Sequence, residues 1–443
     1  MGTTAITTQI RQSLKARLTE ARARTDELLQ IVRPQAFYDR PIPERHRIIF
    51  YLGHLEAFDW TLLAGRVFGR QPFHQEFDRL FAFGIDPVRG GLPDDKPSDW
   101  PAPNEIERYN QHVRHTIDAC LETASFDDRA HPLLQDGFIL QVAIEHRLMH
   151  AETLTYMLHQ LPLDRKFERP IVPAPAGLPA RVHRIEIPAG RATLGCARSR
   201  NGDFGWDNEF GVQEVEVPAF AIDATKVRNG EFLRFVQEDG YQQRTLWTDA
   251  DWEWRAARGL AHPIFWKRRG DQWFYQTMFA ELPLPMDWPV YVSHAEASAY
   301  ARWANQALPS EAQFHRAAYG TPSGLERAYP WGHEPAGARH GNFNFHRWDP
   351  TPVGSHPEGG SAFGVADLVG NGWEWTSTPF APLPGFEPFS FYPGYSADFF
   401  DDQHYVAKGA SPRTAACLLR RTFRNWFQPR YPYAYVGFRL VEN

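Results

Sequence analysis

The residue pattern of this chain changes at a proline-rich stretch, RPIVPAPAGLPARVHR, which occupies residues 169–184. Before this stretch, apolar residues recur at the spacing of amphipathic helices. After it, short alternating segments such as HRIEIPAG and QEVEVPAF stand between loops rich in Gly, Pro, Asn and Trp. The 443 residues are therefore predicted to form two domains, 1–168 and 185–443, joined by a linker over 169–184.

Four stretches of the first domain have helical periodicity. They cover residues 8–32, 43–68, 104–123 and 132–159. Proline at the start of the second stretch and Gly69 after its end are typical start and stop signals of a helix. With one long irregular connection over residues 83–103, these helices predict a four-helix bundle.

The second domain is predicted to be α+β, with little regular structure and a core of aromatic side chains. Its clearest helices are expected over residues 229–239 and 293–306. The chain contains 15 Trp, 16 Tyr and 32 Phe, which supply the large side chains that such a core requires.

Composition argues against several classes of function. A net charge of −6 without a basic patch disfavours a nucleic-acid partner. Cys120, Cys196 and Cys417 are isolated and form no CxxC pair, so neither a disulfide framework nor a thiolate zinc site is predicted. The sequence contains no 18-residue apolar run and no apolar core of a signal peptide, so a soluble cytoplasmic protein without a membrane partner is expected.

Three histidines interrupt the apolar helix faces of the first domain. In EHRLMHAETL, His146 and His150 are four residues apart and share a stripe with Val142. In FYLGHLEAFDWTLL, His54 shares a stripe with Tyr51. Three imidazoles from two helices are therefore predicted to point into one bundle interior, where facing helices can build a metal site.

A structural role competes with this interpretation. A single histidine on a core face is usually a hydrogen-bonded core residue, but several buried imidazoles each need a partner. The third histidine favours a metal, and three neutral nitrogen ligands suit either zinc with an open position or redox iron. Glu152, two residues after His150, is interpreted as either a partner of a ligand or a solvated residue.

The motifs of the second domain follow one another in a recognisable order. IEIPAGRATLG comes first, followed by WDNEFGVQEVEVPAFAID, GNGWEW and RNWFQPRYPYAYVGFRL. This series resembles the formylglycine-generating-enzyme (sulfatase-modifying factor) family, which has a C-type-lectin-like fold. The bundle, with HLEAFDW and HRLMHAE, resembles the DinB-like domain. Both domains in this order resemble the ergothioneine sulfoxide synthases and their relatives, the selenoneine synthases.

The resemblance implies an iron enzyme. It implies that His54, His146 and His150 hold a non-haem Fe(II), with O2 as co-substrate. The acceptor is then hercynine, the trimethylated betaine of histidine, whose imidazole C2 takes up the chalcogen. The matching catalytic tyrosine, which supplies a proton or an electron, is Tyr392 in FYPGYS; the alternative is a structural tyrosine.

The same resemblance assigns the hercynine side of the site. Tyr395, Asn425 and Trp426 match residues that line it, and aromatic faces attract a quaternary ammonium group independently of any family. The formylglycine-generating enzymes use a pair of cysteines near the C-terminal end, where this chain has only Cys417. Copper-dependent formylglycine chemistry is therefore not expected, and the active site is expected at the histidines, where the two domains meet.

The sequence departs from the family where the donor should bind. Synthases that take γ-glutamylcysteine have an acidic residue directly after the Trp of RNW and a basic residue four positions later. Phe427 and Tyr431 stand there in this chain, and KGAS replaces the family's GGSW. The loop before the third helix offers only Arg89. Losing both charges removes charge-assisted contacts to a zwitterionic donor, whereas aromatic rings suit the faces of a sugar.

These observations predict a mononuclear non-haem iron enzyme that joins selenium to C2 of hercynine, using O2 and a 1-seleno-sugar. The first alternative is an ergothioneine sulfoxide synthase that takes γ-glutamylcysteine or cysteine. The second alternative is a ligand-binding module without catalytic activity that contains a structural metal.

Overall fold

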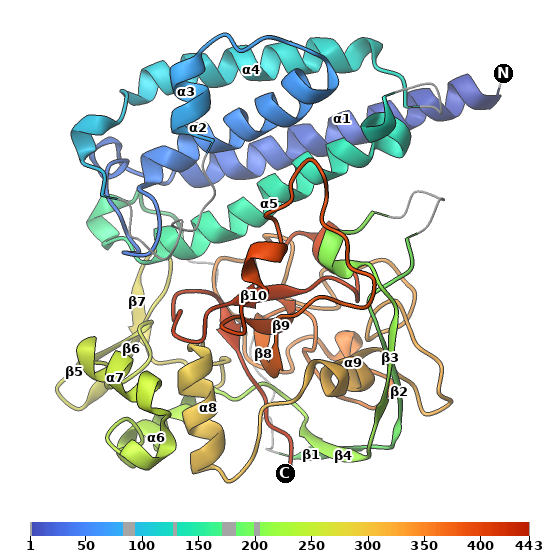
Figure 1. Cartoon of the computed structure of the whole chain (residues 1–443). Helices are drawn as coiled ribbons and strands as arrows, with labels where there is room; N and C mark the ends of the chain where they lie inside the picture. Colours follow the sequence, from blue (N-terminus) through green and yellow to red (C-terminus); the bar gives the residue numbers. More distant parts are fainter. Residues whose placement is uncertain (1, 83–93, 127–130, 171–182, 199–203, 443) are drawn as a thin grey trace. The chain divides into compact units, whose positions relative to one another are not determined.

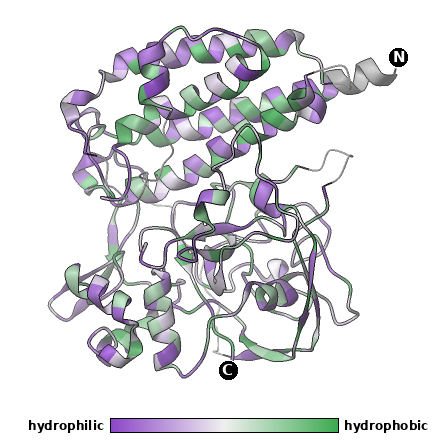
Figure 2. Cartoon of the chain, viewed as in Figure 1, coloured by the Kyte–Doolittle hydropathy of each residue, from purple (hydrophilic) through white to green (hydrophobic). Residues whose placement is uncertain are grey.

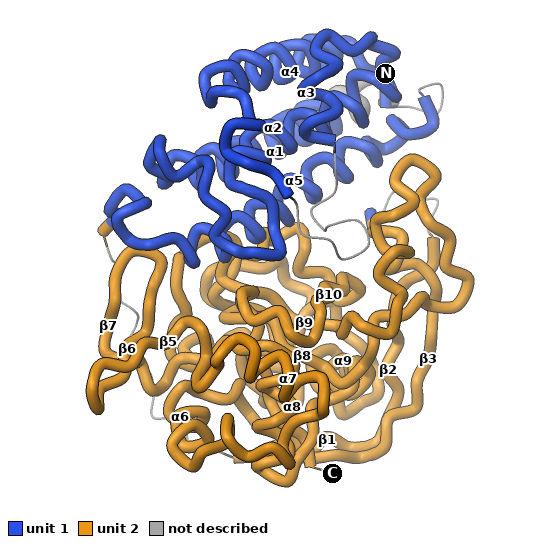
Figure 3. Tube along the Cα trace, turned by 60° about the vertical axis from the view of Figure 1, so that its left-hand side comes forward, with its two compact units in different colours: residues 1–169, 200–204 blue, residues 170–199, 205–443 orange. Residues whose placement is uncertain are grey.

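The computed structural model describes residues 2–82, 94–126, 131–170, 183–198 and 204–442 (Figure 1). The chain divides into two compact units, residues 1–169 with 200–204 and residues 170–199 with 205–443 (Figure 3). The predicted linker lies mostly outside the described residues, so the predicted domain boundaries stay predictions. Arg89 also lies outside the described residues.

The first unit is a bundle of four long helices, as predicted. They are α1 (Gly2–Leu29), α2 (Ile48–Asp59), α4 (Pro103–Thr123) and α5 (Phe138–His159). Helix α1 packs along α5, and α2 packs against both α4 and α5. Figure 2 shows hydrophobic residues along these helices, and most residues of α2 and α5 are buried.

Helix boundaries depart from the predictions in three helices. Helix α1 covers Gly2–Leu29, where residues 8–32 were predicted. The second helix begins at Ile48, because residues before it are extended or in turns, and it continues as a π-helix, η2 (Trp60–Val67). The last helix begins only at Phe138, because Asp136 and Gly137 have positive φ angles of 53° and 72° that interrupt a helix. A Cβ atom at Gly137 would also meet Leu14.

Shorter helical pieces complete the first unit. They are α3 (Gln75–Leu80), which the sequence did not predict, and the 3-10 turns η1 (Pro34–Ala36), η4 (Pro97–Asp99), η5 (Pro132–Gly137) and η6 (Leu163–Arg165).

The second unit is α+β, as predicted, and its described residues form four small sheets. The sheets are β1 (Arg184–Ile187) with β4 (Phe220–Asp223); β2 (Gly190–Leu194) with β3 (Gln213–Val217); β5 (Trp266–Arg269), β6 (Gln272–Gln276) and β7 (Glu281–Pro283); and β10 (Asn425–Phe427), β9 (Tyr405–Ala410), β8 (Gly372–Pro379) and β11 (Val436–Gly437) in that order. Neighbouring strands are antiparallel except for β8 and β11, which are parallel.

Four helices accompany these sheets. They are α6 (Asn229–Gln237), α7 (Asp249–Ala257), α8 (His294–Trp303) and α9 (Glu311–Tyr319), with 3-10 turns η7 (Asp207–Glu209), η8 (Arg244–Leu246), η9 (Pro357–Gly359), η10 (Ala397–Phe399) and η11 (Ala416–Leu418). Both predicted helices, α6 and α8, are present. Helices α7 and α9 were missed, although Thr248 and Ser310 cap them in the manner that a sequence can reveal.

Strand β8 contributes Glu374 to a buried cluster of ion pairs in the second unit. Glu374 accepts hydrogen bonds from Arg439 at 2.6 and 2.8 Å and lies 3.1 Å from the Lys226 ammonium, and all three side chains are fully buried. Burial alone would raise the pKa of Glu374, but Arg439 and Lys226 lower it below the usual value. The flanking Trp373 and Trp375 are also buried, so this strand lies in the core.

Two further predictions concern the whole chain. All three cysteines are free. Among the described helices, none has the length and apolar character needed to cross a membrane.

Candidate functional site

The structure brings the three predicted histidines together inside the first unit. His54 comes from α2, whereas His146 and His150 are one turn apart on α5. One ring nitrogen of each lies within 4.8 Å of those of the other two. The side chains are 2–4% exposed, so all three imidazoles are buried.

A hydrogen bond to the main chain orients His54. Its Nδ1 atom donates to the Phe81 carbonyl oxygen at 2.7 Å. This bond selects the tautomer in which Nε2 keeps its lone pair. Nε2 is buried and has no hydrogen-bond partner within the described part of the chain. An orphaned acceptor of this kind is what a metal ligand looks like before its ion is added.

All three imidazoles are held neutral. Burial lowers the pKa of His54 to about 4, although the hydrogen bond to Phe81 raises it somewhat. Burial, and then the neighbouring histidines, also lower the pKa values of His146 and His150 well below the usual range. Because a neutral imidazole presents a lone pair and an imidazolium does not, the cluster is ready to bind a cation at neutral pH.

The spacing of His146 and His150 is compatible with a single ion. The Nε2 atoms of His146 and His150 are 3.1 Å apart. Two nitrogen ligands about 2.1 Å from one ion stand about 3.0 Å apart when they subtend a right angle. Stacking of Phe58 on His146, with ring centroids 3.5 Å apart, and of Phe50 on His54 at 4.7 Å restricts the rotation of these rings. The residues present therefore fit a divalent transition metal with three nitrogen ligands.

A buried ion-pair network is formed by residues that are close in the sequence to these histidines. Arg147 donates to Glu56 at 2.6 and 3.0 Å and to Asp59 at 2.7 Å. All three side chains are 1% exposed. Arg114 of α4 also donates to Glu56, at 2.6 Å. These contacts hold α5 against α2, the two helices that provide the histidines.

Glu152 is 7% exposed, which excludes the solvated alternative predicted for it. Its role beside the ligands stays a prediction.

The predicted catalytic residue Tyr392 lies in the second unit, within a loop between β8 and β9. Its side chain is half-buried, and its ring centroid is 5.5 Å from that of Tyr395. Tyr395 stacks on Trp206 at 4.0 Å. The sequence neighbour of Tyr395, Ser396, donates to Asp207 at 2.5 Å, so the start of η7 holds this loop.

The residues predicted to line the hercynine side of the site form one aromatic surface with this loop. Trp426 stands edge-on to Tyr395, with centroids 5.6 Å apart, and stacks on Phe380 at 4.2 Å. Asn425 begins β10, and its Oδ1 atom accepts a hydrogen bond from the Trp426 amide at 2.9 Å. The side chain of Asn425 is half-buried and its Nδ2 group is left to donate.

Phe427 and Tyr431 also contact each other. Their rings are parallel within 4°, with centroids 5.9 Å apart. Tyr431 is 7% exposed, and Phe427 is half-buried and stands edge-on to Trp375. Phe427 and Tyr431 stand at the two positions where the sequence lacks the expected charged pair. Their rings therefore form a continuous aromatic wall.

Lys408, the first residue of the altered KGAS motif, is a core residue. Its ammonium donates to the carbonyls of Arg421 and Phe423, at 2.9 and 2.7 Å. Burial lowers its pKa to about 8. The lysine thus anchors the chain that leads into β10, which carries Asn425 and Trp426.

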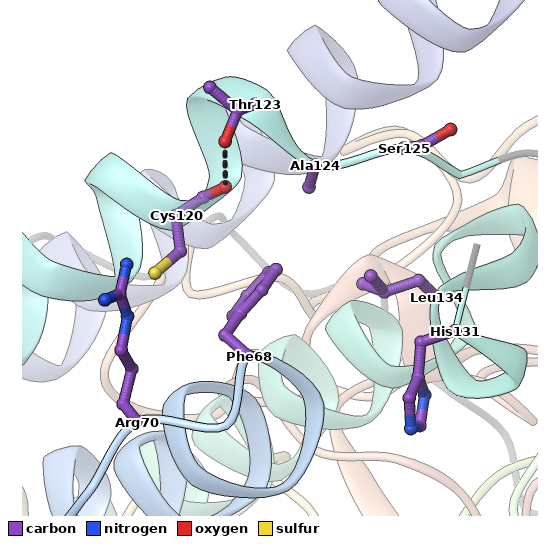
Figure 4. A pocket seen from close by; sticks show the side chains of 8 residues that line it. All are labelled: Phe68, Arg70, Cys120, Thr123, Ala124, Ser125, His131 and Leu134. Carbon is purple, nitrogen blue, oxygen red and sulfur yellow. Dashed lines mark hydrogen bonds between the residues drawn. The ribbon is translucent and has the colours of Figure 1, made fainter.

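A separate cavity of about 300 Å³ opens in the first unit (Figure 4). Its lining is Phe68, Arg70, Cys120, Thr123, Ala124, Ser125, His131 and Leu134. None of the predicted site residues is among them.

Sequence reasoning missed the residues that support the ligands. The Phe81 contact uses a main-chain carbonyl, for which no residue type is diagnostic. The network around Arg147 did leave a signal, because Glu56 and Asp59 are charged residues inside an apolar helix.

Comparisons with known proteins agree with this two-part organisation. Residues 173–443 match the family described as Sulfatase-modifying factor enzyme 1-like domain, and residues 17–154 match the DinB superfamily. The first match covers more than half of the chain.

Three relatives match this chain over most of its length. Hercynine oxygenase of Mycobacterium tuberculosis is 36% identical over 314 residues, which cover 69% of this chain and 72% of that protein. Hercynine oxygenase of Mycolicibacterium smegmatis is 32% identical and covers 97% of this chain and 99% of that protein. Ergothioneine biosynthesis protein 1 of Neurospora crassa is 28% identical and covers 94% of this chain and 56% of that protein. The chain therefore belongs to the family of hercynine oxygenases and related ergothioneine-biosynthesis proteins, with a sulfatase-modifying factor enzyme 1-like domain after its DinB-superfamily bundle.

Proposed function

We propose that this chain is a mononuclear non-haem iron enzyme that joins selenium to C2 of the hercynine imidazole, using O2 and a 1-seleno-sugar. The observation that carries the proposal is the buried cluster of neutral imidazoles from His54, His146 and His150. It occurs in a chain related to proteins named hercynine oxygenase. When bound to these residues, iron supplies the redox chemistry that couples O2 to the two organic substrates.

The overall reaction balances with one molecule of O2. Hercynine loses the hydrogen on C2 and the selenol loses its own hydrogen, and these hydrogens leave as water with one oxygen atom. The other oxygen atom adds to selenium and gives a selenoxide. Forming the carbon–selenium bond and oxidising selenium together release four electrons, which the reduction of O2 consumes.

The second unit supplies groups suited to hercynine. Tyr395 and Trp426 offer aromatic faces, and such faces attract a quaternary ammonium group by about 0.5–2 kcal/mol. The Nδ2 group of Asn425 is suited to donate to the betaine carboxylate. We assign Tyr392 the transfer of a proton or an electron, and the anchored loop around it supports this role by limiting its motion.

The donor assignment depends on the aromatic wall. A donor with α-amino and α-carboxylate groups would place unpaired charges against Phe427 and Tyr431, and each poorly satisfied charged group costs roughly 1.5–3 kcal/mol. A sugar brings hydroxyl groups and apolar ring faces, which aromatic rings can stack against. We therefore infer that a 1-seleno-sugar exceeds γ-glutamylcysteine by at least about tenfold in kcat/KM.

Metal content and product mass test the proposed function together. The protein is loaded anaerobically with Fe(II), mixed with hercynine and each donor, and exposed to O2. His54→Ala, His146→Ala and His150→Ala should each lower the iron content and abolish product, since a site with three ligands has no spare one. Circular dichroism checks that the helices persist.

The alternatives predict different results from the same experiment. Product with γ-glutamylcysteine or cysteine alone would make the chain an ergothioneine sulfoxide synthase. Bound iron without O2 consumption, whichever donor is supplied, would favour a ligand-binding module with a structural metal. A variant in which all three histidines are replaced by alanine could also keep the wild-type iron content. That result would place the metal elsewhere and refute the proposal.

A further inference from the structure

Helix α2 contains a glycine, Gly53, directly before His54. Glycine inside a helix costs about 1 kcal/mol relative to alanine, because its backbone loses more freedom on folding. Gly53 has no positive φ angle, so its conformation does not require glycine. The space around Gly53 does require glycine, because a Cβ atom there would lie 2.5–2.6 Å from three ring carbons of Phe81.

Phe81 therefore contacts two successive residues of α2, Gly53 and His54. The Phe81 ring lies against Gly53, and the Phe81 carbonyl accepts the hydrogen bond from Nδ1 of His54. Phe81 follows α3 and is fully buried. Its ring also has aromatic neighbours, with centroids 5.6 Å away at Phe77 and 6.1 Å away at Trp100.

We propose that Gly53 is a positioning residue for the metal centre. Its missing Cβ lets Phe81 lie close against α2, and the Phe81 carbonyl then fixes the tautomer and ring orientation of His54. This inference rests on the proposed role of the histidines as metal ligands. Losing the hydrogen-bond partner of a ligand histidine typically lowers metal affinity by about 10–100-fold.

A methyl group at position 53 perturbs this arrangement in a defined way. The Phe81 ring would have to retreat by about 1 Å to reach an ordinary carbon–carbon contact of about 3.5 Å. Because Phe77 and Trp100 pack close to the ring, we expect the retreat to move the main chain of Phe81 and its carbonyl oxygen away from His54.

Cobalt binding to the full-length protein tests this inference. Co²⁺ serves as the probe because its visible absorption reports both affinity and ligand arrangement. Gly53→Ala should raise the Kd for Co²⁺ by about 10–100-fold and change the visible spectrum. Gly65→Ala is the matched control. Gly65 also lies in a helix, η2, but a Cβ there would lie 3.6 Å from the Trp60 carbonyl oxygen, an ordinary van der Waals distance, so the Kd of this variant should stay at the wild-type value.

A double variant separates positioning from a general loss of stability. Phe81→Leu removes Cε2 and Cζ, two of the three ring carbons that the new methyl group would meet, leaves only a flexible branched side chain at the δ position, and keeps the main-chain carbonyl. Gly53→Ala should therefore change the Kd for Co²⁺ by less than about threefold when Phe81→Leu is already present. This comparison also decides the matter if Gly53→Ala alone fails to fold.

The possible outcomes separate the role of Gly53 from the metal centre itself. An unchanged Kd for Co²⁺ in Gly53→Ala would overturn the inference, as would an equal loss in the Phe81→Leu background. If His54→Ala binds Co²⁺ like the wild type, the proposed metal centre itself fails. If His54→Ala loses Co²⁺ while Gly53→Ala keeps it, the metal centre stands and only the role of Gly53 is wrong.

Discussion

Replacing Arg147 by methionine is expected to destabilise the helical unit by about 3 kcal/mol or more, because breaking a buried ion pair from one side costs about 3–5 kcal/mol. Arg147 links α5 to Glu56 and Asp59 of α2, and methionine keeps most of the volume without the charge. Glu56 keeps Arg114 as a partner. The larger part of the loss therefore falls on Asp59, whose Oδ1 atom is already buried without a partner among the described residues.

The same substitution should make stability depend on pH. Burial raises the pKa of Asp59, and Arg147 opposes that rise, so removing Arg147 raises the pKa further. An acid whose pKa is higher in the folded state binds more protons there, so stability falls as pH rises. The deficit of Arg147→Met relative to the wild type is thus expected to be smaller at about pH 5 than at about pH 8.

Urea denaturation of the metal-free protein, followed by the helical circular-dichroism signal, measures this deficit. Arg24→Met is the matched control, since Arg24 is 34% exposed and lies 3.5 Å from Glu20 in an ordinary surface pair. The control should lose less than about 1 kcal/mol. A loss below about 1 kcal/mol for Arg147→Met at both pH values would show that the network does not hold α2 and α5 together.

The remaining predictions concern the second unit. Tyr392→Phe should leave hercynine binding nearly unchanged and slow product formation by about 10²–10⁴-fold, with the donor oxidised instead of coupled; an unchanged rate and product ratio would make Tyr392 structural. Phe427→Asp with Tyr431→Arg should shift kcat/KM towards γ-glutamylcysteine, measured with both donors; no shift would show that these positions do not contact the donor. Ser396→Ala removes the 2.5 Å hydrogen bond to Asp207 and should speed amide hydrogen exchange over residues 389–396, whereas unchanged exchange would mean that the loop is held by its aromatic contacts alone.

The helical bundle and its histidines were predictable from spacing. A four-residue separation places His146 and His150 on one face of any helix, and no tertiary information is needed for that. The start of α5 was not predictable, because the left-handed backbone at Asp136 is set by its surroundings.

The support of the site was hidden for two different reasons. The carbonyl of Phe81 reaches His54 from 27 residues away and has no side-chain signature. Ser396 and Asp207 are 189 residues apart, so their hydrogen bond depends on a fold that spacing cannot reveal. Resemblance to a known family carried the assignments in the second unit, where short strands and loops have weak periodicity.

The most direct test of the proposed function is a competition between donors. The Fe(II)-loaded enzyme receives hercynine, O2 and equal concentrations of a 1-seleno-sugar and γ-glutamylcysteine, and the products are identified by mass during the first turnovers. A hercynine adduct with the isotope pattern of selenium should predominate by at least about tenfold. A predominant sulfur adduct of γ-glutamylcysteine would contradict the proposed donor and make the chain an ergothioneine sulfoxide synthase.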